Sequence, residues 1–196
     1  MLALKIAFTF FLVANPIGNS PAILAVVKDL PFERQRMVLL REALIALALA
    51  LFFQFFGEAF LTSLNIDRYT VSLCGGVMLF IVALKMIFPV RSEQQHLTIK
   101  EPMIVPIATP LISGPGLLTI IMVKSKEEQN FMLISSAILI AWIGVTFVLT
   151  TAPYMQRALG NRGMIALEQL MGMILSMISM EMIVNGSTLF VKTLTP

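Results

Sequence analysis

Two short runs of proline, glycine and small polar residues interrupt otherwise apolar segments of the chain. The first run is Asn15-Pro-Ile-Gly-Asn-Ser-Pro21, and the second is Thr109-Pro-Leu-Ile-Ser-Gly-Pro-Gly116. A proline inside a helix lacks a backbone donor and clashes with the carbonyl four residues earlier. In a membrane, a break of this kind survives only inside protein or beside a water-filled cavity. The two runs therefore predict broken helices whose freed backbone groups can bind a polar solute.

The backbone groups at such breaks favour a zwitterionic solute. A half-helix that starts at Pro21 or Pro115 directs its N–H groups, with about half a positive charge, toward a carboxylate. Carbonyls freed by the prolines can accept hydrogen bonds from an ammonium group. Proline kinks that neighbouring helices relieve are the alternative interpretation. The candidate substrate-binding residues are Asn15, Pro16, Gly18, Asn19, Ser20, Pro21, Thr109, Pro110, Ser113, Gly114, Pro115 and Gly116.

Two charged residues, Lys85 and Glu181, stand inside apolar segments away from these runs. An ionisable residue within a membrane segment is a functional hypothesis by default. Both residues are therefore candidates for coupling solute movement to a proton. The alternatives are a structural pair between the two side chains and charges that reach the membrane interface.

The composition indicates that the segments containing these runs lie in a membrane. The chain has 196 residues, of which 58% are hydrophobic and 13% are charged, whereas soluble domains carry about 25% charged residues. The lipid bilayer is the expected partner, and nucleic-acid binding is excluded. One cysteine and one histidine leave no metal site of the usual spacing. Because the chain also lacks catalytic motifs, we expect no cofactor and no enzymatic activity.

Six apolar segments approach or exceed the roughly 20 residues that a transmembrane helix needs. They are Leu2–Val27, Val38–Leu64, Tyr69–Phe88, Met103–Val123, Phe131–Ala152 and Met164–Val191. Charged or breaker-rich links separate them, among them Tyr154–Gly163. The sequence therefore predicts an all-α membrane protein that forms a single transmembrane domain over residues 1–196.

The second proline run repeats the first. Shifting the chain by 94 residues superposes the prolines of the two runs, and a slightly larger shift places Gly76-Val-Met-Leu on Gly172-Met-Ile-Leu. Each half would hold three helices, and because three is odd, the second half must enter the membrane from the opposite side. We expect six transmembrane helices as two inverted three-helix repeats, with helices one and four broken at paired prolines. The repeats are residues 1–88 and 103–196, joined by a loop at 89–102.

Lysine and arginine counts in the short loops set the expected orientation. One side carries Lys28, Arg34, Arg36, Arg41, Arg91, Lys100, Arg157 and Arg162, and the other carries Lys5, Arg68, Lys124, Lys126 and Lys192. The more positive side is expected to face the cytoplasm. This places both termini on the non-cytoplasmic side of the membrane.

The two runs, in this order and with the Gly75-Gly76 pair between them, closely resemble the MarC family of bacterial and archaeal inner-membrane proteins. The resemblance covers essentially the whole chain. It implies a multi-pass plasma-membrane protein with six helices, of which the first and fourth are broken. It further implies transport of small neutral amino acids such as glycine, alanine or serine. The residues that take the family's substrate-site role are Asn15, Pro16, Gly18, Asn19, Pro21, Pro110, Gly114, Pro115 and Gly116.

Taken together, these patterns favour a secondary transporter that works by alternating access around the two broken helices. A non-transporting membrane scaffold or assembly partner is the alternative from another class, and a transporter of a different small solute is a third possibility. A channel is disfavoured because no helix carries a continuous polar stripe. The sequence does not decide whether the protein forms a homo-oligomer.

Overall fold

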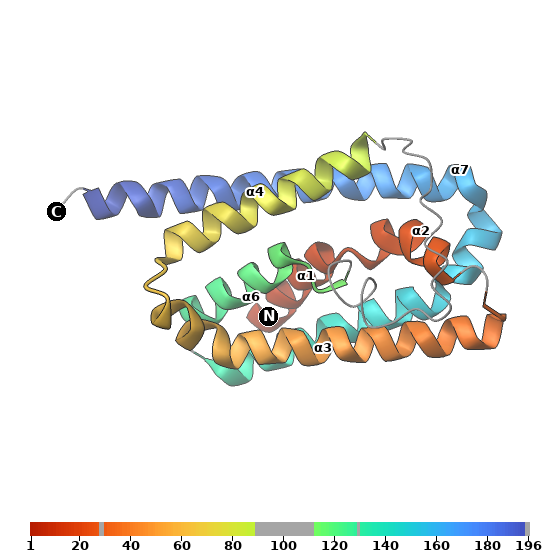
Figure 1. Cartoon of the computed structure of the whole chain (residues 1–196), viewed down its shortest axis with the longest axis horizontal. Coiled ribbons are helices and arrows are strands. Elements are labelled where there is room, and N and C mark those ends of the chain that lie inside the picture. The colour runs from red at the N-terminus through yellow and green to blue at the C-terminus, as the bar shows by residue number, and fades with distance from the viewer. Residues whose placement is uncertain (28–29, 89–111, 129, 195–196) are drawn as a thin grey trace.

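The computed structural model describes residues 1–27, 30–88, 112–128 and 130–194. Every regular element in these ranges is a helix, as the composition predicts. The helices are α1 (Leu2–Ala14), α2 (Pro16–Val27), α3 (Phe32–Ser63), α4 (Arg68–Ile87), α6 (Pro115–Glu128) and α7 (Phe131–Leu194), shown in Figure 1.

Four stretches of the described residues are long and apolar enough to cross a membrane. They are Leu2–Val27, Phe32–Ser63, Arg68–Ile87 and Phe131–Leu194. The predicted membrane character of the chain is thereby confirmed. The first half of the expected fourth segment, residues 103–111, lies outside the described residues.

The long helix α7 contains both of the last two apolar segments. Its regular geometry is interrupted at Gly160, where φ is 62° and ψ is 178°. Glycine adopts this positive φ at little cost because it has no Cβ. The chain reverses direction in this region, so that an N-terminal arm (residues 131–159) and a C-terminal arm (residues 161–194) run in opposite directions (Figure 1). The turn lies within the predicted link Tyr154–Gly163, and the residues on either side of Gly160 stay helical.

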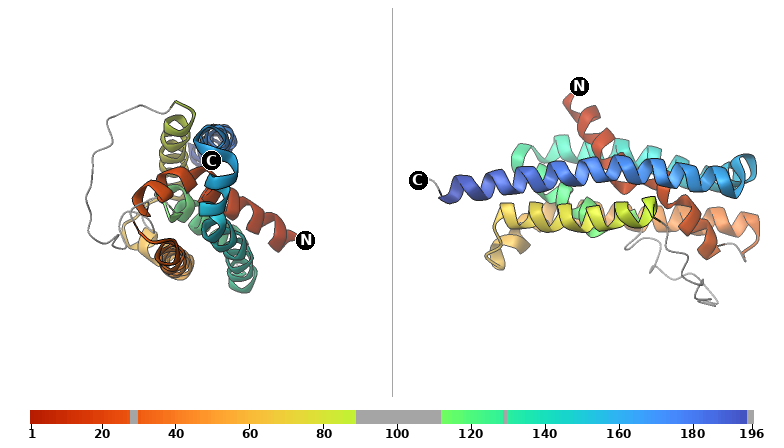
Figure 2. Two further views of the ribbon diagram at one scale, coloured as in Figure 1. Left: turned by 90° about the vertical axis from the view of Figure 1, so that its right-hand side faces the viewer. Right: turned by 90° about the horizontal axis from the view of Figure 1, so that it is seen from above.

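The long helices form two pairs on opposite sides of the molecule. One pair is α3 with the N-terminal arm of α7, and the other is α4 with the C-terminal arm (Figure 1). The shorter helices α1, α2 and α6 lie between the pairs, and α1 runs obliquely, with its N-terminus projecting to the side (Figure 2). The first pair is joined where Trp142 Nε1 donates to the Ala43 carbonyl at 2.7 Å. Gln54 Nε2 joins it again by donating to the Phe131 carbonyl at 3.0 Å.

Two glycines let α4 and the C-terminal arm approach closely. A Cβ atom on Gly76 would lie 3.0 Å from the Ser179 carbonyl oxygen, and one on Gly172 would lie 3.1 Å from the Ala83 carbonyl oxygen. Real Cβ contacts are rarely this short. Small residues at helix interfaces are the usual means of close packing in membranes, because lipid provides no hydrophobic drive for helix association.

Replacing Gly76 by leucine should separate α4 from the C-terminal arm. We expect G76L to lower the stability of the folded protein by about 1–3 kcal/mol, the usual range for overpacking a tight interface. The measurement is the thermal unfolding temperature of the purified protein in detergent. The neighbouring Val77 is 47% exposed, so V77L serves as the matched control and should unfold close to the wild-type temperature. Equal unfolding temperatures for G76L and V77L would contradict this packing.

Candidate functional site

Asn15 forms the junction between α1 and α2. Its backbone is left-handed, with φ 49° and ψ 51°, and its N–H donates to the Phe11 carbonyl, which ends α1. Its side-chain Oδ1 accepts the N–H of Gly18 at 3.1 Å, which caps the first turn of α2. Asparagine is among the few non-glycine residues that visit the left-handed region routinely, and it is also a preferred N-cap residue. One residue therefore ends one helix and starts the next.

The side chains of Asn19 and Ser20 bond to nearby backbone carbonyls. Asn19 Nδ2 donates to the Ala14 carbonyl at 3.3 Å, and Ser20 Oγ donates to the Pro16 carbonyl at 2.6 Å. Asn15 and Ser20 are buried, and Asn19 is half-buried. A Cβ on Gly18 would lie 2.6 Å from Asn15 Oδ1, so the cap requires glycine there. These side chains are held by the backbone around the break.

The expected start of a half-helix at Pro21 is wrong. The helix begins at Pro16, and Pro21 lies inside α2. Pro16 occupies the first helical position, where a missing N–H costs nothing and the fixed φ favours the helix. The cap from Asn15 then holds the turn that precedes Pro21. The N–H of Gly18 is consequently engaged by protein at the N-terminus of α2.

The second run is described from Ile112 onward, so Thr109 and Pro110 lie outside the described residues. Here α6 begins at Pro115, as expected, and the preceding Gly114 carbonyl accepts the N–H of Leu118 at 3.1 Å. Ser113 is buried, and its Oγ donates to the Ala46 carbonyl of α3 at 2.9 Å. Ser113 of the second run is therefore hydrogen-bonded to a neighbouring helix, whereas most hydrogen bonds of the first run are made with nearby backbone groups.

The structure brings both runs against one face of α4. Asn15 Nδ2 donates to the sulfur of Met86 at 3.2 Å, and a Cβ on Gly116 would lie 2.9 Å from Leu79 Cδ1. Leu79 and Met86 are seven residues apart, about two helical turns, and so they share a face. Both side chains are buried. The described parts of the two runs thus meet the same helix about 10 Å apart along its axis.

An apolar hollow is found elsewhere among the described residues. It is an open apolar groove between α1 and the N-terminal arm of α7, and its lining includes Phe8, Phe11, Ile140 and Gly144. None of the candidate substrate-binding residues lines it. In this conformation the described polar groups of the two runs are packed rather than open to a large cavity.

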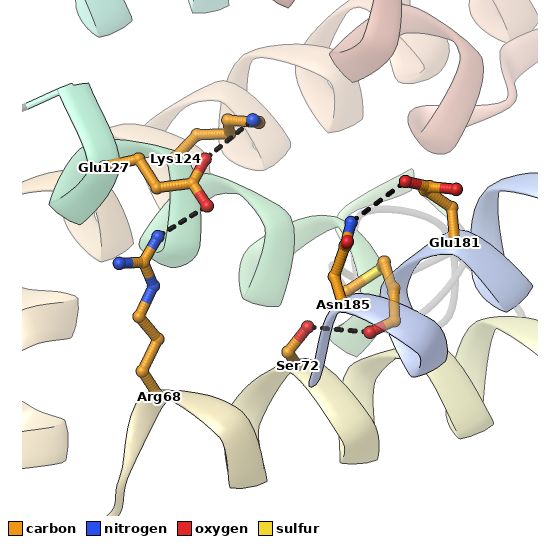
Figure 3. A network of polar contacts seen from close by, with 7 residues as sticks. Arg68, Ser72, Lys124, Glu127, Glu181 and Asn185 are labelled. Atoms are coloured by element: carbon orange, nitrogen blue, oxygen red, sulfur yellow. Dashed lines mark hydrogen bonds and ion pairs between the residues drawn. The ribbon is translucent and has the colours of Figure 1, made fainter. Parts of the chain in front are cut away.

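Lys85 and Glu181, the candidate coupling residues, are both exposed on the helix surface. Glu181 accepts a hydrogen bond from Asn185 Nδ2 at 3.1 Å, one turn along the same helix (Figure 3). Among the ion pairs between described residues, none joins Lys85 to Glu181. The alternative of a structural pair is therefore wrong for this conformation, and the coupling role stays a prediction.

A charged cluster closes one end of the bundle. Arg68 at the start of α4 pairs with Glu127 of α6, and Lys124 pairs with the other carboxylate oxygen of Glu127 at 2.7 Å (Figure 3). Lys126 pairs with Glu58 of α3 at 3.1 Å. These residues are partly exposed and link α3, α4 and α6.

Within the ranges that the structure describes, no group of three or more histidine, cysteine and acidic residues could hold a metal ion.

Sequence reasoning missed one residue, Glu42 of α3. Its side chain is fully buried, with Oε1 held 3.0 Å from Arg41 and Oε2 without any hydrogen-bond partner. The spacing of apolar residues along α3 could have shown that Glu42 lies on its buried face. Leu39, Ala43, Ala46 and Ala50 are the buried positions of α3 around it, and their three- and four-residue spacing places Glu42 on the same face.

Replacing Asn15 by alanine should weaken the junction through two effects. Alanine removes the cap on α2, which is typically worth about 1 kcal/mol, and it adopts the left-handed conformation at a cost of roughly 1–2 kcal/mol. We expect a loss of about 2–3 kcal/mol for N15A, measured by thermal unfolding. Asn130 makes the same kind of cap, since its Oδ1 accepts the Leu133 N–H at 3.1 Å, but it is exposed and has no positive φ. N130A is thus the matched control, and an equal loss in both variants would contradict the double role of Asn15.

Comparison with known proteins agrees with the helical membrane architecture. The family described as "MarC family integral membrane protein" matches residues 2–190. The chain is 39% identical over 189 residues to "UPF0056 inner membrane protein YhgN" from Escherichia coli, covering 95% of this chain and 96% of that protein. It is 32% identical over 189 residues to a UPF0056 membrane protein of Chlamydia pneumoniae, covering 95% and 94% of the two chains. No solved structure matches. With residues 2–190 matched and relatives covered over almost their whole length, the chain belongs to the MarC family of integral membrane proteins.

Proposed function

We propose that this protein is a secondary transporter of small neutral amino acids of the glycine, alanine and serine type. Six helices in two inverted three-helix repeats alternate in exposing a central site to the two sides of the membrane. The substrate class follows from the resemblance to the family's transporters. The protein performs no covalent chemistry in this proposal, and both of its termini are on the non-cytoplasmic side. A homo-oligomer is compatible with it.

Reciprocal contacts between α4 and the C-terminal arm carry the proposal. Gly76 contacts Ser179 and Ile183, while Gly172 contacts Ala83 and Ile87. The sequence offset that relates Gly76 to Gly172 also relates Ala83 to Ser179 and Ile87 to Ile183.

Each contact therefore has a counterpart with the two helices exchanged, and the two helices run antiparallel (Figure 1). A two-fold axis perpendicular to both helices produces such a pattern. An inverted repeat predicts this relation, and inverted repeats are the architecture of many secondary transporters. The contacts thus support the repeat independently of the proline runs.

The broken segments occupy the position that alternating access requires. The helices α1, α2 and α6 lie between the two pairs of long helices, so a rocking motion of one pair against the other would act on both breaks (Figure 1). The N-terminus of α6 is the better end for a substrate carboxylate, because at the N-terminus of α2 the Gly18 N–H is already bonded to Asn15. A solute that binds at the first run has to exchange bonds with Asn15.

One observation favours the alternative of a non-transporting scaffold. Asn15 and Ser20 are buried, and their side chains are bonded to backbone groups of the same run. A scaffold needs breaks that are packed in this way and never opened. The two functions differ in whether substitutions at the breaks affect solute exchange.

The purified protein in liposomes should exchange a small neutral amino acid. The measurement is counterflow of labelled glycine, alanine and serine, with leucine and glutamate as competitors that should fail. The same solutes should raise the thermal unfolding temperature, since a ligand that binds only the folded state stabilises it. Absence of both exchange and stabilisation for every amino acid would leave the scaffold as the better account.

Pro21→Ala and Pro115→Ala should reduce exchange more than they reduce thermal stability. Alanine at position 21 restores the backbone donor that proline lacks inside α2. Alanine at position 115 releases the φ angle that proline fixes at the first residue of α6. The matched control is P153A, because Pro153 also lies inside a helix, α7, but outside both runs. Unchanged exchange in P21A and P115A, with P153A impaired equally or more, would count against a role of the runs in transport.

A further inference from the structure

The carboxyl group of Glu42 is fully buried, and one of its two oxygen atoms has no hydrogen-bond partner. Its Oε1 accepts hydrogen bonds from Arg41 Nε at 3.2 Å and from an Arg41 terminal nitrogen at 3.0 Å. Its Oε2 is shielded from solvent and has no partner. A buried charge is costly unless it is paired and fully hydrogen-bonded. One oxygen of this carboxylate is hydrogen-bonded to Arg41, and the other has no hydrogen-bond partner.

A proton is the ligand that best fits the vacant oxygen. The side chain of Glu42 is 0% exposed, so a larger cation can reach Oε2 only after the helices separate. A proton needs no cavity, and binding it removes the buried negative charge. We propose that Glu42 is the proton-binding site of this protein, with Oε2 as the atom that takes the proton. This inference rests on the proposed transport function only for its role in coupling.

Arg41 gives the site a connection to the membrane surface. Its side chain is 54% exposed, although the neighbouring carboxyl is fully buried. A long cationic side chain can reach from a buried position toward the interface. When Glu42 is protonated, its ion pair with the Arg41 guanidinium is lost. When the proton leaves, the pair re-forms.

Other charged and titratable groups on the helices packed against α3 are distant from this carboxyl. On α6 they stand in its last turns, next to the cluster at the opposite end of α3. On the N-terminal arm of α7, Arg157 and Tyr154 contact the ring of Phe32, at the start of α3. Lys5 of α1 is exposed at the apolar groove, and the C-terminal arm pairs with α4 (Figure 1). Within the described ranges, Arg41 is therefore the ionic partner of Glu42.

The position of Glu42 links a proton to the second run. One turn along α3, the Ala46 carbonyl accepts the Ser113 hydroxyl, and the adjacent Ala43 carbonyl accepts Trp142 Nε1. A change in the charge of Glu42 therefore acts on the segment of α3 that holds both the residue before Gly114 and the N-terminal arm of α7. Coupling of this kind requires a physical link between the proton site and the element that moves, and α3 supplies it.

Trp142 gives a direct test that needs no transport. It is the chain's single tryptophan, it is buried, and its indole is bonded next to Glu42. Its emission, titrated from about pH 4 to pH 9 to bracket the carboxyl and histidine range, should change in one step in the wild type. E42Q should lose the step. E33Q is the matched control on the exposed face of the same helix and should keep it. A step that persists in E42Q, or is absent from the wild type, overturns the proposal.

A second variant keeps the test decisive if E42Q fails to fold. Arg41→Gln removes the cation that stabilises the charged carboxylate, so the carboxyl binds its proton more tightly. The midpoint of the Trp142 titration should then move to higher pH. An unchanged midpoint in R41Q overturns the assignment. This variant retains the Glu42 carboxyl, so the titration still reports on that group.

A transport measurement distinguishes failure of this inference from failure of the proposed function. In liposomes with a pH gradient of about one unit, coupling to one proton allows roughly tenfold accumulation of a neutral amino acid, since one pH unit is a tenfold ratio. The wild type and E33Q should reach it, and E42Q should lose it. Accumulation by E42Q equal to that of the wild type overturns the coupling role. If the wild type exchanges no amino acid at all, the proposed function fails, while the Trp142 titration still decides whether Glu42 binds the proton.

Discussion

A backbone group that leaves a helix inside a bilayer must find its new partner within the protein, because lipid offers none. Asn15 meets this requirement at the junction of α1 and α2. Its own N–H closes α1, its Oδ1 holds the N–H of Gly18, and its Nδ2 contacts the sulfur of Met86. A break with these bonds can lie at the centre of the molecule without water. In the second run, the buried hydroxyl of Ser113 also has a partner within the protein, the Ala46 carbonyl.

Close helix approach is the second requirement, and glycine provides it. Where α4 meets the C-terminal arm, Gly76 and Gly172 place backbone against backbone, and Ser72 Oγ bonds to the Met182 carbonyl at 3.0 Å. Gly75 contacts Thr119 and so joins α6 to the other face of α4. The α4 helix is thus held on two sides by small residues. Interfaces packed this tightly resist gradual deformation.

Much of the helical organisation could be predicted, because the periodicity of apolar residues is a local property. The helices α3 and α4 and the two arms of α7 lie over the predicted segments, and α6 begins at the predicted Pro115. The start of α2 could not be predicted, because both prolines of the first run are able to begin a helix. The hydrogen bond between the Gly18 N–H and Asn15 Oδ1 caps the helix so that Pro16 is its first residue. The position of Glu42 on the buried face of α3 could be predicted from the helical period, whereas the missing partner of its Oε2 atom could not, because that depends on which helices meet.

The sequence by itself determined the membrane environment, the helical content and the family, since composition, period and motif order are written along the chain. It also identified the two proline runs as the polar exceptions in an apolar molecule. Only the tertiary structure decided which polar groups are already paired and which are not. Asn15 and Ser20 are bonded within their own run, while one oxygen of Glu42 has no partner. The reason is that hydrogen-bond satisfaction in a bilayer depends on which helices meet, and no local pattern specifies that.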